Sequence, residues 1–324
     1  MMVDEILTPY QQLIESALAD LPLPKEPARL FDPLRHTLGN GGKRIRPVLT
    51  LLTCELFDAP AEKAIHQAIA VELFHNFTLI HDDFMDDAPL RRGQPTVYSK
   101  WGANVAVLSG DALIVLAYDR LRLNAGERLH DLMEMFNDCA LNVCVGQQLD
   151  MDYAQKGAIS SLQYREMIRL KTGILLGLSC GIGAMMAGAA SHQVAAVRKF
   201  AEHLGIAFQI KDDLLDAFGN QGFGKKLGGD IAEGKHTWLV VKALEVANAS
   251  QKNELQQAFA LSDDKSKIER VTALFRKLGL EEMGNEAVKS ESETALSALK
   301  SVKGNPRAMA KLETLTNALI WRTV

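Results

Sequence analysis

The sequence predicts an all-α protein, and three features of its 324 residues support that fold class. Apolar residues recur at three- and four-residue spacing over long segments, which is the period of a helix with one buried face. Alternation of the β type never extends beyond a few residues. Hydrophobic residues make up 47% of the chain and no linker interrupts it, so residues 1–324 are predicted to form one domain, a bundle of long helices.

The first helices are bounded by clear breaks in the pattern. Segment 3–19 ends before LPLPKEP, and segment 28–39 ends at a run of glycines. A third helix starts near Arg46 and Pro47, because proline is tolerated in a first helical turn. A fourth, strongly apolar helix covers 61–87 and stops before Pro89.

The rest of the chain continues the same pattern. Further helices are predicted at 104–123, 127–153, 160–190 and 192–218, followed by a glycine-rich loop at 219–234 and four shorter helices starting near Thr237, Lys265, Glu281 and Pro306. Gly173 lies inside the third of these long helices, where it is expected to loosen or kink the helix and free a carbonyl group.

Composition excludes several classes of function. The net charge of −4 gives no general attraction for nucleic acid or an anionic membrane, so an anionic substrate would need a local basic cluster. The four cysteines form no CxxC pair and are predicted to be buried, reduced thiols. The first residues lack the pattern of a signal peptide, and no apolar stretch reaches membrane-spanning length. We therefore expect a cytoplasmic protein without a membrane span.

Two aspartate-rich motifs are the sharpest signals in the sequence. DDFMD begins at Asp82 and DDLLD begins at Asp212, and each ends a strongly apolar helix. Aspartates four residues apart share one helix face, where they repel each other near the negative end of the helix dipole. Hard divalent cations offset this repulsion, and Mg²⁺ prefers carboxylate oxygen and bridges readily to phosphate. If the two helices face each other, their carboxylates could grip a cluster of metal ions.

Basic clusters accompany both motifs. GGKRIRP places three cations, Lys43, Arg44 and Arg46, and free backbone N–H groups at a helix start, a natural anion site. Arg91 and Arg92 follow the first acidic motif, and GKKLGGD…EGK follows the second. None of these matches a phosphate-binding GxxxxGK[ST] loop.

Taken together, these motifs resemble the trans-isoprenyl diphosphate synthases over nearly the whole chain, in the order of that family. The matching motifs are GGKRIRP, ELFH, DDFMD, LRRG, GQQLD, KTG, QIKDDLLD and GKKLGGD…EGK. The resemblance implies a helical fold around a deep central cavity, a homodimer, and isoprenoid diphosphates as substrates. It also implies head-to-tail condensation of isopentenyl diphosphate with an allylic diphosphate.

The resemblance further implies roles for individual residues. Three Mg²⁺ ions would be held, directly or through water, by Asp82, Asp83, Asp86, Asp212, Asp213 and Asp216. Isopentenyl diphosphate would bind at Gly42, Lys43, Arg46, His75 and Arg92. The allylic diphosphate would bind at Arg91, Lys171, Lys225 and Lys235. Thr172, Gln209 and the Lys171 carbonyl would face the developing cation, supported by Gln147 and Asp150.

Product length should be set by the helix that leads to Asp82. Phe77 stands five residues before the motif, Thr78 four before it and Phe74 eight before it. One aromatic beside a small residue resembles family members that stop at geranylgeranyl diphosphate (C20), with farnesyl diphosphate (C15) as the next expectation. Core packing alone would also explain Phe77.

Two other functions compete with the synthase. A class I terpene cyclase shares the helical fold and one DDxxD motif, but it usually carries a different second motif and needs no second diphosphate site. A non-catalytic relative would be expected to have lost an aspartate or a basic ligand, and no such loss occurs here.

Overall fold

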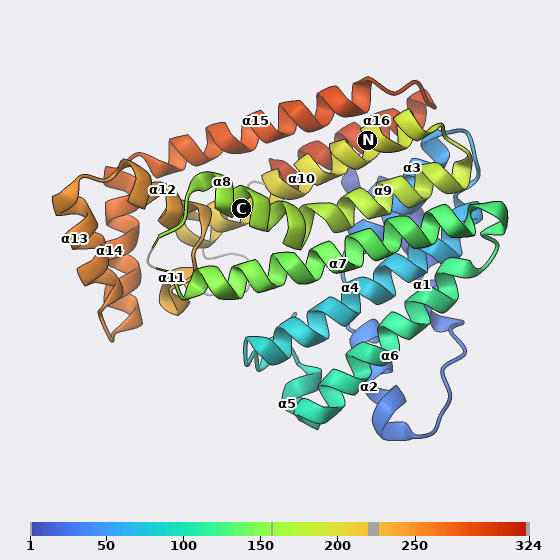
Figure 1. Ribbon diagram of the computed structural model, residues 1–324, viewed down its shortest axis with the longest axis horizontal. Coiled ribbons are helices and arrows are strands. Elements are labelled where there is room, and N and C mark those ends of the chain that lie inside the picture. Colours follow the sequence, from blue (N-terminus) through green and yellow to red (C-terminus); the bar gives the residue numbers. More distant parts are fainter. Residues whose placement is uncertain (1, 157, 220–226, 322–324) are drawn as a thin grey trace. The chain divides into compact units, whose positions relative to one another are not determined.

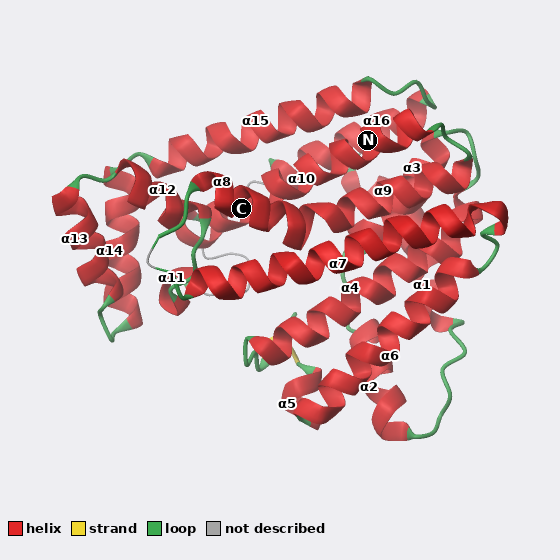
Figure 2. Cartoon of the chain, in the orientation of Figure 1, coloured by secondary structure: helices red, strands yellow, loops and turns green. Residues whose placement is uncertain are grey.

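The described part of the chain is helical nearly throughout, as predicted. The computed structural model describes residues 2–156, 158–219 and 227–321. Figures 1 and 2 show long helices joined by short loops, and the strands within this part are confined to the two-residue pair β1 (Leu90–Arg91) and β2 (Gln94–Pro95).

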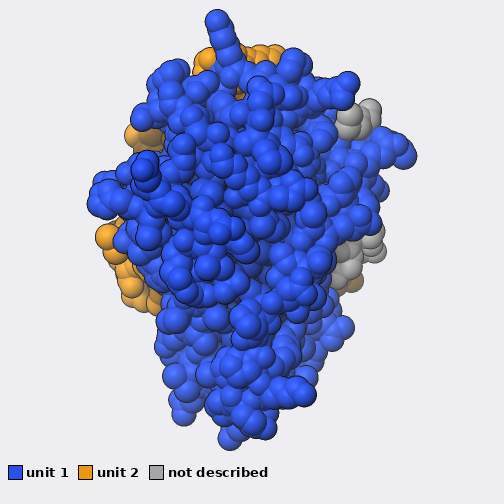
Figure 3. All heavy atoms as spheres, turned by 90° about the vertical axis from the view of Figure 1, so that its right-hand side faces the viewer, with its two compact units in different colours: residues 1–138, 178–198, 302–315 blue, residues 139–177, 199–301, 316–324 orange. Residues whose placement is uncertain are grey.

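The chain divides into two compact units, which Figure 3 colours separately. The first comprises residues 1–138, 178–198 and 302–315, and the second comprises residues 139–177, 199–301 and 316–324. Each unit carries one of the two acidic motifs.

The first unit is organised around α4 (Ile65–Met85), which packs along α6 (Ala103–Arg122). Residues 68–71 of α4 are at most 2% exposed. A helix that is apolar on all sides must be enclosed by its neighbours. Further elements of this unit, of which the last extends into the second, are α1 (Val3–Ala19), α2 (Ala28–Gly39), α3 (Ile45–Leu56), the 3₁₀ turns at Ala61–Ala64 and Gly126–Arg128, α5 (Val97–Trp101), and α16 (Pro306–Ile320).

The second unit contains the second acidic motif on α10 (Ser191–Phe218). Several of its short helices begin with a side-chain cap, such as Ser160, which accepts a hydrogen bond from the Gln163 N–H. The other elements of the unit, some of which extend into the first, are α7 (Leu129–Ala154), α8 (Ser161–Ile168), the π-helical turn Arg169–Gly173, α9 (Ile174–Ala187), α11 (Gly229–Glu233), α12 (Trp238–Val246), α13 (Ala249–Phe259), α14 (Asp264–Lys277) and α15 (Leu280–Lys300).

Most predicted helices occur within a few residues of their expected bounds, and four local differences stand out. The expected loop around Arg91 forms the β1–β2 hairpin, and α11 lies inside the expected glycine-rich loop. The helix α13 was not predicted. The prediction of four buried thiols is wrong for Cys144, which is exposed.

One described segment, 161–187, is long and apolar enough to cross a membrane by length and composition. Its most apolar window is 78% buried inside the protein, so this segment is a core element of the bundle.

Candidate functional site

The first acidic motif occupies the last turn of α4. Asp82 lies within the helix and Asp86 caps its end, where the Asp86 N–H still donates to the Asp82 carbonyl at 2.8 Å. Helical spacing therefore keeps the two carboxylates on one side of the turn, and both are partly or fully exposed.

The middle aspartate of this motif behaves differently. Asp83 is 4% exposed and accepts a hydrogen bond from Arg91 Nε at 2.7 Å. Burial raises the pKa of Asp83 above its ordinary value, although Arg91 opposes that shift. The ion pair attaches the β1–β2 hairpin to α4.

The basic loop before α3 lies in the same unit. Gly41 and Gly42 have φ values of 66° and 133°, which residues with a side chain adopt only with strain. The Arg92 guanidinium donates to the Gly41 carbonyl, and a β-carbon on Gly42 would lie 2.5 Å from Arg92 Nη1. Glycine at position 42 therefore allows Arg92 to lie directly on the loop.

His75 on α4 faces Arg46 on α3. Arg46 Nη1 lies 3.1 Å from His75 Nε2, and because arginine can only donate, this ring nitrogen is the acceptor. Burial, followed by the charges of Arg46 and Arg92, holds the pKa of His75 well below its usual range. His75 is therefore a neutral imidazole whose Nε2 accepts a hydrogen bond from Arg46.

The predicted product-length residues lie along α4 in one aromatic row. The Phe74 and Phe77 rings are 5.5 Å apart, and Phe77 contacts the His81 ring at 4.7 Å. Phe74 is buried against Phe136 of α7, whereas Phe77 is partly exposed. The Thr78 hydroxyl donates to a carbonyl of its own helix at 2.8 Å.

In the second acidic motif, on α10, the second aspartate is again the buried one. Asp213 is 4% exposed, and its carboxylate accepts hydrogen bonds from the Tyr164 hydroxyl at 2.6 Å, the Trp238 N–H at 2.8 Å and Gln209 Nε2 at 3.1 Å. Burial raises the pKa of Asp213 to about 7 despite these hydrogen bonds. Asp212 is less buried than its neighbour.

Asp216, the last aspartate of this motif, is tied to the following loop. Its Oδ2 accepts a hydrogen bond from the Asp230 N–H at 3.1 Å, at the start of α11. Lys235 pairs with Glu233 at 2.6 Å and with Asp230 at 3.5 Å. This short helix therefore links Lys235 to the acidic motif, while Lys225 lies outside the described residues.

The KTG segment forms the π-helical turn, which agrees with the expectation that Gly173 loosens its helix. Lys171 Nζ contacts Asp150 Oδ2 of α7 at 2.5 Å. A β-carbon on Gly146 would lie 2.5 Å from the Lys171 backbone nitrogen, so α7 contacts this turn through its backbone. Thr172, in the same turn, is partly exposed.

Both motifs fit a hard divalent cation by the chemistry of their oxygen donors. Asp82 and Asp86 are spaced one helical turn apart, as are Asp212 and Asp216. Among the described residues, the only three-ligand group found lies elsewhere, on exposed side chains near the start of α7. Diphosphate oxygens and water would therefore complete coordination at the acidic motifs.

Sequence reasoning missed the structural roles of three polar residues that organise these sites. Tyr164 supports Asp213, while Arg44 and Glu72 form a buried ion pair at 2.6 Å beneath the basic loop. The sequence places Arg44 among the three cations of the expected anion site, but its side chain is buried and faces the protein.

The comparisons with known proteins agree with the resemblance that the sequence motifs indicate. A family model described as polyprenyl synthetase matches residues 27–278. A geranylgeranyl pyrophosphate synthase of Geoglobus acetivorans is 39% identical over 75% of this chain and 77% of its own. The crystal structure of a Pyrococcus horikoshii geranylgeranyl pyrophosphate synthetase has a TM-score of 0.92 and 32% identity, covering 98% of this chain and 99% of the other.

A third relative bears on metal binding. The structure of a Caulobacter crescentus polyprenyl synthase was determined in complex with calcium and isoprenyl diphosphate, and it matches with a TM-score of 0.89 and 26% identity over 100% of this chain and 98% of its own. Divalent metal binding thus occurs within the family. The chain belongs to the polyprenyl synthetase family, and it is a trans-prenyltransferase that makes isoprenyl diphosphates.

Proposed function

We propose that this chain joins isopentenyl diphosphate head to tail to allylic diphosphates, stops at geranylgeranyl diphosphate and releases diphosphate. The main support is the presence of two acidic motifs together with a separate basic cluster for a second diphosphate. Farnesyl diphosphate is the second candidate product, since Phe74 and Phe77 both line the helix before Asp82.

The isopentenyl diphosphate would bind at Gly42, Lys43, Arg46, His75 and Arg92. The neutral His75 accepts a hydrogen bond from Arg46 and so holds the guanidinium in place without cancelling its charge. The allylic diphosphate would bind at Arg91, Lys171, Lys225 and Lys235. Asp150 and Glu233 already neutralise Lys171 and Lys235, so binding would exchange these ion pairs for contacts with the diphosphate.

Magnesium, with three ions expected, is the cofactor that these carboxylates fit best. We propose that Asp82, Asp86, Asp212 and Asp216 are the direct ligands, whereas Asp83 and Asp213 orient the motifs from inside. The support is that both inner aspartates are 4% exposed and already accept protein hydrogen bonds. Bound magnesium would stabilise the negative charge that grows on the departing diphosphate.

The protein's own groups would complete the reaction. The allylic carbon–oxygen bond breaks, the double bond of isopentenyl diphosphate attacks the resulting cation, and the departing diphosphate takes the released proton. Thr172, Gln209 and the Lys171 carbonyl would present oxygen atoms toward the cation. The aromatic row of α4 would exclude water and limit the length of the growing chain.

We also propose that the protein acts as a cytoplasmic homodimer. Along α6, Leu108 and Val115 are 59% and 67% exposed and lie seven residues apart, on one face of the helix. A second copy of the chain would cover this face. Light scattering of Leu108→Glu and Val115→Glu variants should show monomers, and an unchanged dimer would exclude this surface.

The test of the activity is direct condensation. Purified protein would be incubated with Mg²⁺, isopentenyl diphosphate and, separately, dimethylallyl, geranyl or farnesyl diphosphate, and the dephosphorylated products would be identified by mass. A C20 product that disappears with EDTA supports the proposal. Hydrocarbons formed from an allylic diphosphate alone would indicate a terpene cyclase, and no product from folded protein would indicate a non-catalytic relative.

A pair of variants tests the residue that limits product length. Phe77→Ala should extend the product beyond C20 because it removes the partly exposed ring before Asp82. Phe31→Ala removes a partly exposed ring from α2 and should leave the product unchanged. A C15 product from the wild-type protein would make the buried Phe74 the effective limit, and an unchanged product in Phe77→Ala would exclude Phe77.

A further inference from the structure

Arg44 has an unusual position among the cations of the basic loop. It stands between Lys43 and Arg46, two proposed ligands of isopentenyl diphosphate, yet its side chain is only 1% exposed. Its φ of 50° lies in the left-handed region, which few residues other than glycine adopt. The backbone therefore turns this one cation of the cluster into the protein.

The Arg44 guanidinium binds three separate elements. Nε donates to Glu15 of α1 at 2.8 Å, Nη1 donates to Glu72 of α4 at 2.6 Å, and Nη2 donates to the Leu38 carbonyl near the end of α2 at 2.6 Å. Asn76 Nδ2 also donates to Glu72 Oε1, at 3.1 Å, and fixes that carboxylate. Charge-assisted hydrogen bonds of this kind are the strongest in proteins.

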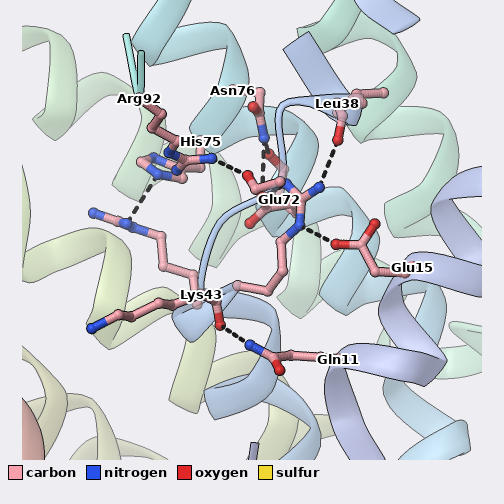
Figure 4. A network of polar contacts seen from close by, with 11 residues as sticks. Gln11, Glu15, Leu38, Lys43, Glu72, His75, Asn76 and Arg92 are labelled. Carbon is pink, nitrogen blue, oxygen red and sulfur yellow. Dashed lines mark hydrogen bonds and ion pairs between the residues drawn. The ribbon is translucent and has the colours of Figure 1, made fainter. Parts of the chain in front are cut away.

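A second contact reinforces the first from the same helix. Gln11 Nε2 of α1 donates to the Lys43 carbonyl at 3.0 Å (Figure 4). Gln11 and Glu15 are four residues apart, so they share one face of α1 and hold two consecutive residues of the loop. Figure 4 shows the Lys43 side chain directed away from both.

We propose that Arg44 is a positioning residue for isopentenyl diphosphate, and that α1 and Glu72 hold it in place. This inference deepens the proposed function and rests on it. The loop contains Gly41 and Gly42, so it would sample many conformations without a fixed point. With Arg44 clamped, the Lys43 and Arg46 side chains start from fixed backbone positions, and binding costs less conformational entropy.

The positive charge of Arg44 should make its effect specific to isopentenyl diphosphate. Glu72 is 2% exposed and interacts electrostatically with Arg92 as well as with Arg44. Without the Arg44 charge, the buried Glu72 carboxylate would attract Arg92 and compete with the diphosphate for it. A carboxylate left without its partner inside a protein exerts a strong field, because little water screens it.

The principal test is Arg44→Gln, assayed with Mg²⁺ by varying one substrate while the other is saturating. We expect KM for isopentenyl diphosphate to rise about tenfold or more, while KM for farnesyl diphosphate stays within about twofold. Titration calorimetry with isopentenyl diphosphate should show the same weakening without turnover. The Arg44→Gln/Glu72→Gln double variant should recover part of the loss, because no buried charge then competes for Arg92.

Two variants at the protein surface test the same inference should Arg44→Gln fail to fold. The Glu15 side chain is 50% exposed, so Glu15→Ala and Gln11→Ala each remove one hydrogen bond that holds the loop, without opening the core. Both should raise KM for isopentenyl diphosphate by about twofold to fivefold. Arg35→Gln is the matched control, since Arg35 binds Asp32 and two loop carbonyls elsewhere and should change neither KM.

The outcomes separate this inference from the proposed function. Absence of condensation in the wild-type protein would contradict the proposed function, while calorimetry would still test the role of Arg44. A folded Arg44→Gln variant with unchanged affinity for isopentenyl diphosphate would overturn the inference. So would equal losses for both substrates that follow a fall in melting temperature, because they would show a role in stability alone.

Discussion

Gly110 of α6 lies directly against the His81 ring of α4, and this contact predicts the effect of a single added methyl group. A β-carbon on Gly110 would lie 2.5 Å from His81 Cδ2 and 3.1 Å from Cε1, well inside van der Waals contact. The ring has little freedom to retreat, because it packs on Phe77 at 4.7 Å and its Nε2 lies 3.2 Å from the Val107 carbonyl.

The expected magnitude for Gly110→Ala follows from two opposing effects. Overpacking a core contact costs about 1–3 kcal/mol. Replacing a glycine inside a helix returns about 0.5–1 kcal/mol. The overpacking term is the larger on average, so the free energy of unfolding should fall by about 1 kcal/mol. Because a chain of 324 residues has a large unfolding entropy, a loss of about 1 kcal/mol should lower the melting temperature by roughly 1–2 °C.

Thermal unfolding followed by circular dichroism measures this change, and two comparisons identify its cause. Gly39→Ala is the control, because no atom lies within 4 Å of its added β-carbon, and it should not lower the melting temperature. His81→Ala loses the ring but removes the obstacle, so the Gly110→Ala/His81→Ala variant should be no less stable than His81→Ala alone. Additive losses in this double-mutant cycle would refute the steric argument.

Two further predictions concern the second unit. Burial would raise the pKa of Glu291, but His203 and Arg165, at 2.6 Å each, hold it below its ordinary value. This stabilisation is present above about pH 4.3 and is lost as pH falls through the depressed value, so Glu291→Gln should flatten the fall in stability between about pH 5 and about pH 3 in chemical denaturation. Gly205→Ala would place a β-carbon 2.6 Å from the Gly173 Cα, which is backbone and cannot rotate away. It should destabilise by about 3 kcal/mol and raise KM for the allylic substrate, and a wild-type melting curve would contradict this.

Sequence periodicity predicted the helices well where amphipathic faces are regular. Segments 3–19 and 28–39 agree with α1 and α2, and both acidic motifs end long buried helices or lie within their last turns. The helix α13 was missed because its sequence, ASQKNELQQAF, has few apolar residues to mark a face. The hairpin around Arg91 was missed because two-residue strands are too short to show alternation.

The partners of polar residues could not be predicted in the same way. Arg44 finds Glu15 and Glu72 at separations of 29 and 28 residues, and Tyr164 finds Asp213 at 49. Local spacing contains no information on such contacts. The inward direction of Arg44 depends on a left-handed backbone at a non-glycine residue, which sequence patterns do not mark.

The unequal burial of the aspartates, in contrast, follows from helix geometry and was available in the sequence. Successive residues of a helix turn by about 100°, so positions one and five of DDxxD share a face and position two points elsewhere. A neighbouring aspartate on a buried helix must then face the protein, where a carboxylate needs partners. Arg91 supplies them to Asp83, and Tyr164 with Gln209 supplies them to Asp213. The motif therefore combines an outer pair, which we propose binds metal, with an inner carboxylate that is held by protein hydrogen bonds.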